Sequence, residues 1–239
     1  RHGHHVEAPA GFSIFLSGFL VKAALYCFYL FTLVLHCDLV IIMVSCVAFW
    51  SVLEASIKLW TQLDFKKLIA FATIQEMNLI LYLLVNLNTT ISYSLLVFIL
   101  VHGWLSTLMF FTVDVIQKKT STRNLAVLSG FAYTYVMLRY IIWLIIVLFA
   151  GFPFTVKFAV EWQIMGALAS QCAVVMLVLF FTALVAGTVG FAKQMLIILY
   201  GMPRPGLKYN TVISKRDIQW LYCIAGLLVS LTLVNFYFF

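Results

Sequence analysis

Charged residues are scarce in this sequence: they account for 10% of its 239 residues, whereas 64% are hydrophobic. An ordinary soluble domain is about 45–50% apolar and about 25% charged, so this chain has too little polar surface to cover a soluble globule. Its apolar runs are long and continuous, which argues against the short alternating segments of a transmembrane β-barrel. We therefore expect an all-α integral membrane protein.

Motifs for soluble chemistry are also absent from the sequence. The five cysteines lie far apart without a Cys-x-x-Cys pair, so we interpret them as small hydrophobic residues. There is no Gly-rich phosphate loop, no metal-ligand spacing and no nucleophile elbow. The chain is expected to bind no cofactor and no metal. The net charge is +7, and the basic residues lie mostly between the apolar runs, where such residues set the orientation of a protein in the membrane. We therefore expect membrane lipids and not nucleic acid as partners.

Long apolar segments predict about seven transmembrane helices in a single domain, residues 1–239. The segments are 12–35, 38–60, 67–86, 91–116, 133–165, 171–200 and 218–239. The fifth is interrupted near Pro153, and since proline must break or kink a helix, we count it as one discontinuous span. Seven spans place the basic clusters on one side of the membrane, as the positive-inside pattern expects. Residues 201–216, with two prolines, are predicted to form a polar loop.

Four titratable residues lie deep within these spans: Lys22, Glu76, His102 and Glu161. An amine, an imidazole and two carboxylates are groups that a proton path needs, and ionisable residues inside a membrane are costly unless they function or pair. If their helices pack together, the four residues form one polar thread at mid-membrane depth. Lys157 lies four residues before Glu161, which predicts contact on one helix face, either as a neutralising ion pair or as a modulator of Glu161.

Four stretches resemble, in order, motifs of the subunit 4 family of mitochondrial NADH dehydrogenase, the respiratory complex I. They are HHVEAPAGFSIFLSGFLVKAALY, TQLDFKKLIAFATIQEMN, LVHGWLSTLMFF followed by KKTSTRNL, and GFPFTVKFAVEW. The resemblance covers residues 1 to about 165 by motif and the remainder by pattern. It implies half of an antiporter-like fold and a mitochondrial inner-membrane location.

The resemblance also implies a function: a proton-translocating membrane-arm subunit of NADH:ubiquinone oxidoreductase, contributing the central and exit part of a channel coupled to quinone reduction. The chain would be a subunit of an enzyme without a redox centre of its own. NADH, flavin, iron–sulfur clusters and ubiquinone would bind other subunits. Two alternatives stay open, namely a subunit of a cation/proton antiporter and a non-pumping structural scaffold of the membrane arm.

The family motifs assign roles to individual residues. Lys22 matches the family's central lysine, His102 its central-axis histidine and Glu161 the glutamate at the helix break. Glu76 stands where the family usually has histidine, and it either relays a proton or pairs with Lys22. The predicted relay is therefore Glu76, Lys22, His102 and Glu161.

Three further residues are possible modulators of the relay: Lys157, His5 and Glu7. Lys157 stands where the family usually has a neutral residue. Family members also carry a first half of comparable size, with part of the proton input path. We expect a second chain to supply that N-terminal half, alongside the other membrane-arm subunits of complex I.

Overall fold

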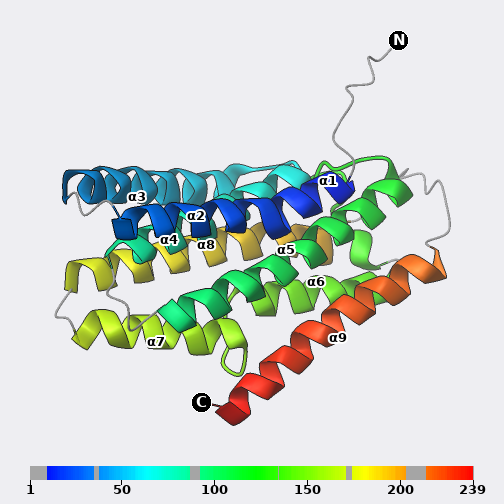
Figure 1. Ribbon diagram of the computed structural model, residues 1–239. Coiled ribbons are helices and arrows are strands. Elements are labelled where there is room, and N and C mark those ends of the chain that lie inside the picture. The colour runs from blue at the N-terminus through cyan, green and yellow to red at the C-terminus, as the bar shows by residue number, and fades with distance from the viewer. Residues whose placement is uncertain are drawn as a thin grey trace.

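The computed structural model describes residues 10–34, 38–86, 92–133, 135–170, 174–202 and 214–238. Within these ranges the chain is helical apart from turns and one isolated bridge between Asp64 and Asn124. The elements are α1 (Ala10–Phe15), the π-helical turn η1 (Leu16–Leu20), α2 (Val21–Val34), α3 (Asp38–Thr61), α4 (Phe65–Asn86), α5 (Ser92–Thr120), the 3₁₀ turn η3 (Phe131–Tyr133), α6 (Val136–Phe149), α7 (Val156–Ser170), α8 (Val174–Tyr200) and α9 (Lys215–Phe238). Figure 1 shows the long helices running side by side, with α9 inclined across the others.

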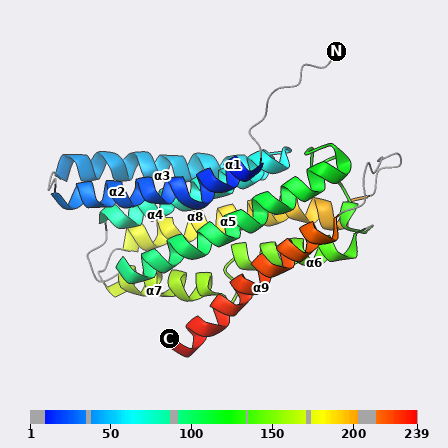
Figure 2. The same cartoon turned by 45° about the vertical axis from the view of Figure 1, so that its right-hand side comes forward.

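The predicted all-α membrane architecture is confirmed. Five helical stretches are long and apolar enough to cross a membrane, namely Gly11–Phe31, Leu39–Thr61, Phe65–Asn86, Leu96–Thr120 and Val174–Tyr200. Helices α6 and α7 have 14 and 15 residues, fewer than the roughly 20 that a span needs. They lie end to end below α5 in both views, so together they form the one discontinuous span (Figures 1 and 2).

The break between α6 and α7 is a defined turn around Pro153. Two of its residues have positive φ, Gly151 at 62° and Phe154 at 77°, so the chain cannot continue as a right-handed helix through it. Thr155 then starts α7, because its Oγ1 accepts the backbone N–H of Phe158 at 3.2 Å. A threonine at this position satisfies one of the donors that a new helix leaves without a partner.

Helix α8 packs closely on α3 because it presents glycine there. A Cβ added to Gly190 would lie 2.7 Å from Cδ1 of Trp60, and one added to Gly187 would overlap the Gln75 amide. The Trp60 indole donates to the carbonyl of Ala186 at 3.0 Å. These contacts fix α3, α4 and α8 as one layer against which α5 and the broken span lie.

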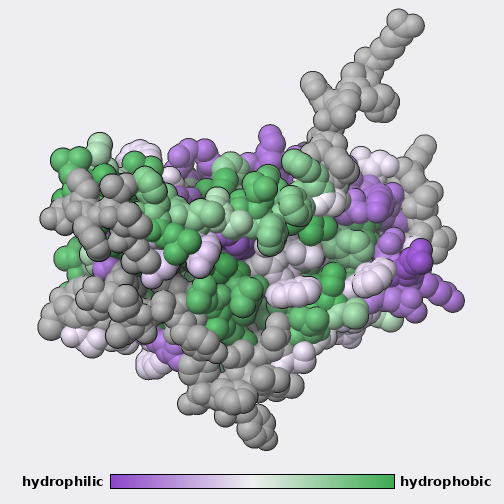
Figure 3. All heavy atoms as spheres, viewed as in Figure 1, coloured by the Kyte–Doolittle hydropathy of each residue, from purple (hydrophilic) through white to green (hydrophobic). Residues whose placement is uncertain are grey.

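The surface agrees with a membrane location. Figure 3 shows hydrophobic residues along the middle of the visible face, and hydrophilic residues gathered toward the end where α9 begins. Basic residues at the start of α4, the end of α5 and the start of α9 all lie at that end (Figure 1). Most of the predicted loop 201–216 lies outside the described residues, and α9 begins within it at Lys215.

Candidate functional site

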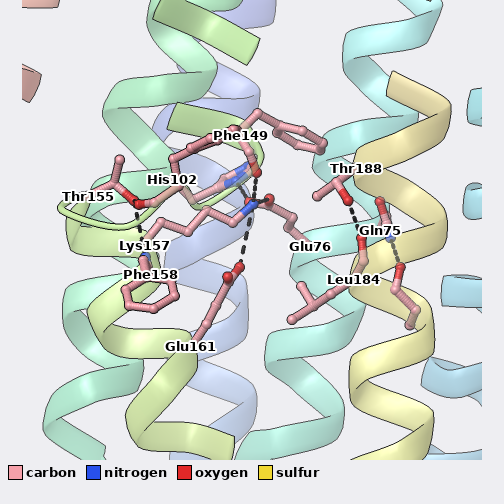
Figure 4. Close-up of polar contacts among 12 residues, drawn as sticks. Gln75, Glu76, His102, Phe149, Thr155, Lys157, Phe158, Glu161, Leu184 and Thr188 are labelled. Carbon is pink, nitrogen blue, oxygen red and sulfur yellow. Dashed lines mark hydrogen bonds and ion pairs between the residues drawn. The ribbon is translucent and has the colours of Figure 1, made fainter. Parts of the chain in front are cut away.

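Four buried charged or titratable side chains meet where α4 and α5 pass the broken span (Figure 4). Glu76 comes from α4, His102 from α5, and Lys157 and Glu161 from α7. Their exposed fractions are 2% for Glu76, His102 and Lys157 and 7% for Glu161. The structure brings Glu76, His102 and Glu161 of the four predicted relay residues together with Lys157, and it leaves Lys22 outside this group.

Glu76 is the centre of this network. Its Oε2 is hydrogen-bonded to Nδ1 of His102, and its Oε1 accepts a hydrogen bond from Nζ of Lys157. Lys157 Nζ also lies 3.6 Å from Oε1 of Glu161, so the predicted contact on one face of α7 is confirmed. The ion-pair partner of Glu76 is therefore Lys157, and the suggested pairing with Lys22 is wrong. Lys22 lies on α2, at the edge of the bundle, whereas Lys157 extends from α7 directly to Glu76 on α4.

The helix break supplies part of the site. Lys157 donates a further hydrogen bond to the carbonyl of Phe149, the last residue of α6, and its Nζ lies 4.3 Å from the centre of the Phe149 ring. The last carbonyls of a helix have no intrahelical partner, so the ammonium satisfies one of them. Gly151 faces the carboxylate of Glu161: a Cβ there would lie 2.6 Å from Oε2.

Two atoms of the network have no hydrogen-bond partner among the described residues. They are Nε2 of His102 and Oε1 of Glu161, and both are buried. Buried polar atoms are nearly always satisfied, so each such exception calls for water, an ion or a chemical role. Nε2 of His102 is therefore free to exchange a proton at one end of the network, whereas Oε1 of Glu161 faces Lys157 at 3.6 Å without a hydrogen bond.

Lys22 lies beside this network without joining it. It is half-buried at the start of α2, and its Nζ donates to the carbonyl of Ser17 in the π-helical turn. Its Cε would be 3.9 Å from a Cβ placed on Gly103, the residue after His102. The structure thus brings Lys22 close to the His102 turn of α5 while pairing it with a backbone oxygen.

Sequence reasoning missed a cluster of hydroxyl groups next to Lys22. Ser17 Oγ is hydrogen-bonded to Thr73 Oγ1 at 3.2 Å and to Ser106 Oγ, which joins η1, α4 and α5. Helices η1 and α5 approach closely here because a Cβ on Gly103 would lie 3.2 Å from the carbonyl oxygen of Gly18. Small and hydroxylic residues at matching depth in three apolar segments were the available signal.

A cavity of about 460 Å³ adjoins this hydroxyl cluster. Ser17 and Thr73 contribute to its wall, as do Asp64, Lys67 and Arg123 at the basic end of the bundle. Most of the remaining wall is apolar. The cavity therefore extends from the charged end of the helices to the hydroxyl groups beside Lys22.

The remaining predicted residues and groups are placed as follows. His5 and Glu7 lie outside the described residues. Within the described ranges, no group of three or more His, Cys, Asp or Glu side chains is arranged to hold a metal ion. Glu54 and Lys58 form an ion pair with i, i+4 spacing, and both side chains are about half exposed.

Residues 3–186 match the family described as NADH:quinone oxidoreductase/Mrp antiporter, TM. The NADH-ubiquinone oxidoreductase chain 4 of Paramecium tetraurelia is 33% identical over 97% of this chain and 49% of that protein. The chain 4 of Acanthamoeba castellanii is 27% identical over 67% of this chain and 33% of that protein. The chain thus spans about half the length of the Paramecium relative.

Solved structures share the fold at low sequence identity. A chain of the archaeal membrane-bound sulfane sulfur reductase matches 97% of this chain and 47% of its own length, with a TM-score of 0.83 and 19% identity. A chain of the Mrp complex from Dietzia sp. matches 94% of this chain and 50% of its own length, with a TM-score of 0.77 and 15% identity. A chain of respiratory complex I from Thermus thermophilus matches 81% of this chain and 43% of its own length, with a TM-score of 0.64 and 16% identity.

Proposed function

Because the chain belongs to the NADH:quinone oxidoreductase/Mrp antiporter family, we propose that it is part of a proton-translocating membrane-arm subunit of NADH:ubiquinone oxidoreductase. Relatives that carry the name NADH-ubiquinone oxidoreductase chain 4 support this choice and a place in the mitochondrial inner membrane. The observation that carries the proposal is the buried network of Glu76, His102, Lys157 and Glu161 at a helix break. Ionisable groups at this depth are costly and usually mark an ion or proton path.

The contacts support a different order of transfer from the one expected from sequence. Ser17 and Thr73 of the hydroxyl cluster line the cavity, and Lys22 lies beside them. His102 is placed next because the Lys22 side chain approaches Gly103, the following residue of α5. His102 is hydrogen-bonded to Glu76, and Lys157 connects Glu76 to Glu161. The proposed order is therefore Lys22, His102, Glu76 and Glu161, with Lys157 between the two carboxylates.

Electron transfer belongs to other subunits in this proposal. NADH, flavin, iron–sulfur clusters and ubiquinone would bind elsewhere in the complex, and this chain would respond to quinone reduction through changes in neighbouring charges. A charge that moves beside a buried acid changes how firmly that acid holds its proton. Lys22 lies at the edge of the bundle, so a change of charge in a neighbouring subunit would act on its ammonium first.

The partner proposed for the chain is a second polypeptide that supplies the other half of the antiporter-like fold. The first span is the least buried of the five long apolar stretches. Its aromatic residues Phe12, Phe15 and Phe19 are all more than half exposed. A second half packed against α1, η1 and α2 would cover this face and enclose Lys22.

One alternative is a subunit of a cation/proton antiporter, which the similarity to the Mrp complex chain favours. Another is a structural scaffold, which the pairing of Lys157 with Glu76 favours because packed ion pairs can persist without transport. Native mass spectrometry after mild detergent extraction separates the antiporter from the respiratory subunit. Co-migration with NADH dehydrogenase activity is expected, together with a second short chain; migration without flavin and iron–sulfur subunits would refute the respiratory assignment.

A test of transport itself is Glu161→Gln in the complex reconstituted into liposomes. The expected result is a lower number of protons translocated per electron while NADH still reduces quinone. Glu54→Gln is the matched control, because Glu54 is an exposed glutamate with a lysine at the same spacing. An unchanged proton-to-electron ratio in the Glu161 variant would support the scaffold instead.

A further inference from the structure

Lys157 contacts two buried carboxylates that come from different helices. Its Nζ is hydrogen-bonded to Glu76 of α4 and lies 3.6 Å from Glu161 of α7. We propose that Lys157 is a positioning residue that keeps one of these two carboxylates charged at a time and moves between them as protons pass. The proposal rests on the proposed function and concerns a residue that replaces the neutral one expected from the family resemblance.

Counting charges supports this role. The site contains two carboxyl groups and one ammonium, all at most 7% exposed. A buried charge without a compensating partner is strongly destabilising, so one ammonium supports one carboxylate and the other carboxyl group is neutral. We assign the negative charge to Glu76, because it accepts hydrogen bonds from both Lys157 and His102. Oε1 of Glu161, in contrast, accepts no hydrogen bond.

The other charged groups around the site leave this balance in place. His102 approaches Glu76 from α5, and since a carboxylate can only accept, Nδ1 is the donor of that hydrogen bond. The proposal assigns His102 the neutral form, with Nε2 free to accept a proton. Lys22 approaches from α2 and is held by the carbonyl of Ser17. Lys157 is thus the ammonium that touches both carboxyl groups.

The geometry allows Lys157 to change partners with a small movement. A charge-assisted hydrogen bond is about 2.8 Å long, so an approach of about 0.8 Å would bond Lys157 to Glu161. The carbonyl and ring of Phe149 hold the ammonium from a third side during that movement. The ammonium therefore pivots inside the site and never has to leave it.

The step that follows is balanced in protons and charge. A proton reaches Nε2 of His102, and the proton on Nδ1 passes to Oε2 of Glu76, which becomes neutral. Lys157 then moves to Glu161, and Glu161 releases its proton as it becomes the charged partner. One proton enters at His102 and one leaves at Glu161. The sum of charges on Glu76, Lys157 and Glu161 is zero before the step and zero after it, and it is +1 only between the protonation of Glu76 and the release from Glu161, which favours that release.

Lys157→Met is the direct test, in the complex reconstituted into liposomes. Without the ammonium both carboxyl groups must be neutral, so infrared spectra should show one more protonated carboxyl group than the unaltered complex. The proton-to-electron ratio should fall to the value of Glu161→Gln. Lys58→Met is the matched control, since it removes a lysine with i, i+4 spacing to an exposed glutamate and should change neither readout.

The outcomes separate this inference from the proposed function. If Glu161→Gln lowers the ratio but Lys157→Met leaves both the ratio and the carboxyl signal unchanged, the switching role is wrong and transport by the chain stands. If neither variant lowers the ratio, the proposed function itself is wrong.

Glu76→Gln keeps the inference testable should the Lys157 variant fail to assemble. Glutamine mimics the protonated carboxyl group, so the structure of this variant should show Lys157 Nζ within hydrogen-bonding distance of Glu161. An ammonium that stays at its present 3.6 Å from Glu161 in that variant would overturn the proposal.

Discussion

Gly151 connects the shape of the helix break to the position of a relay residue. Its φ of 62° is in the left-handed region, which costs an alanine roughly 1–2 kcal/mol relative to its preferred conformation. An added Cβ would also lie 2.6 Å from Oε2 of Glu161, whereas ordinary contact begins at 3.4 Å. The carboxylate would have to retreat by about 0.8 Å in a packed interior, where small displacements are not absorbed freely.

Gly151→Ala should therefore affect stability and transport together. Displacing the Glu161 side chain from its rotamer adds about 0.5–1.5 kcal/mol to the backbone cost of roughly 1–2 kcal/mol, so we expect a loss of about 1.5–3.5 kcal/mol in all. The distance between Glu161 and Lys157 changes with the same displacement, so the number of protons translocated per electron should fall. The measurements are the thermal unfolding midpoint of the purified complex and proton transport in liposomes.

Gly166→Ala is the control for this substitution, because Gly166 lies on α7 and an added Cβ meets nothing within 4 Å. Alanine inside a helix is favoured over glycine by roughly 0.5–1 kcal/mol, so this variant should be slightly more stable and transport normally. If Gly151→Ala matches Gly166→Ala in both measurements, then Glu161 is not held in place by the turn, and the reasoning fails.

Three other substitutions test contacts outside the buried network. Asp64→Ala removes the side chain that accepts the backbone N–H of Lys66 at 2.9 Å, and it should lower stability by about 1 kcal/mol in thermal unfolding. Gly190→Ala places a Cβ 2.7 Å from Trp60 and should cost about 1–3 kcal/mol by the same measurement. Lys58→Met removes a half-exposed ion pair with Glu54 and a contact between the ammonium and the Phe71 ring, 5.1 Å from its centre. The change in its unfolding free energy should be at most about 1 kcal/mol, and a larger loss would show that these are more than surface contacts.

The transmembrane helices were largely predictable from the sequence. The segment predicted at 67–86 is helix α4 (Phe65–Asn86), and the one predicted at 171–200 is helix α8 (Val174–Tyr200). The break was predictable from Pro153, because proline excludes itself from a helix interior by its geometry alone. Each of these features depends on local chemistry, and a single segment of sequence contains the information.

The contacts between helices were not predictable in the same way. Apolar patterning gives the depth of a residue in the membrane but not the lateral order of helices. The sequence therefore suggested Lys22 as a partner for Glu76 and linked Lys157 only to Glu161, its neighbour on the same helix. The π-helical turn Leu16–Leu20 was missed for a related reason. A span that is apolar on all sides shows no change of face when its helical register shifts by one residue.

The helix break explains why Lys157 can serve this site. In an unbroken helix, residues eight positions apart are separated by about 12 Å along the axis, too far for Lys157 to bond the carbonyl of Phe149. The turn around Pro153 instead brings the end of α6 and the start of α7 together. An ammonium at the start of a helix opposes that helix's dipole, whereas one at the end of a helix is favoured, so the carbonyl end of α6 offsets the cost of placing Lys157 at the start of α7. The broken span and the buried network are therefore a single structural feature, and a change to the turn should act on Glu76 and Glu161 through Lys157.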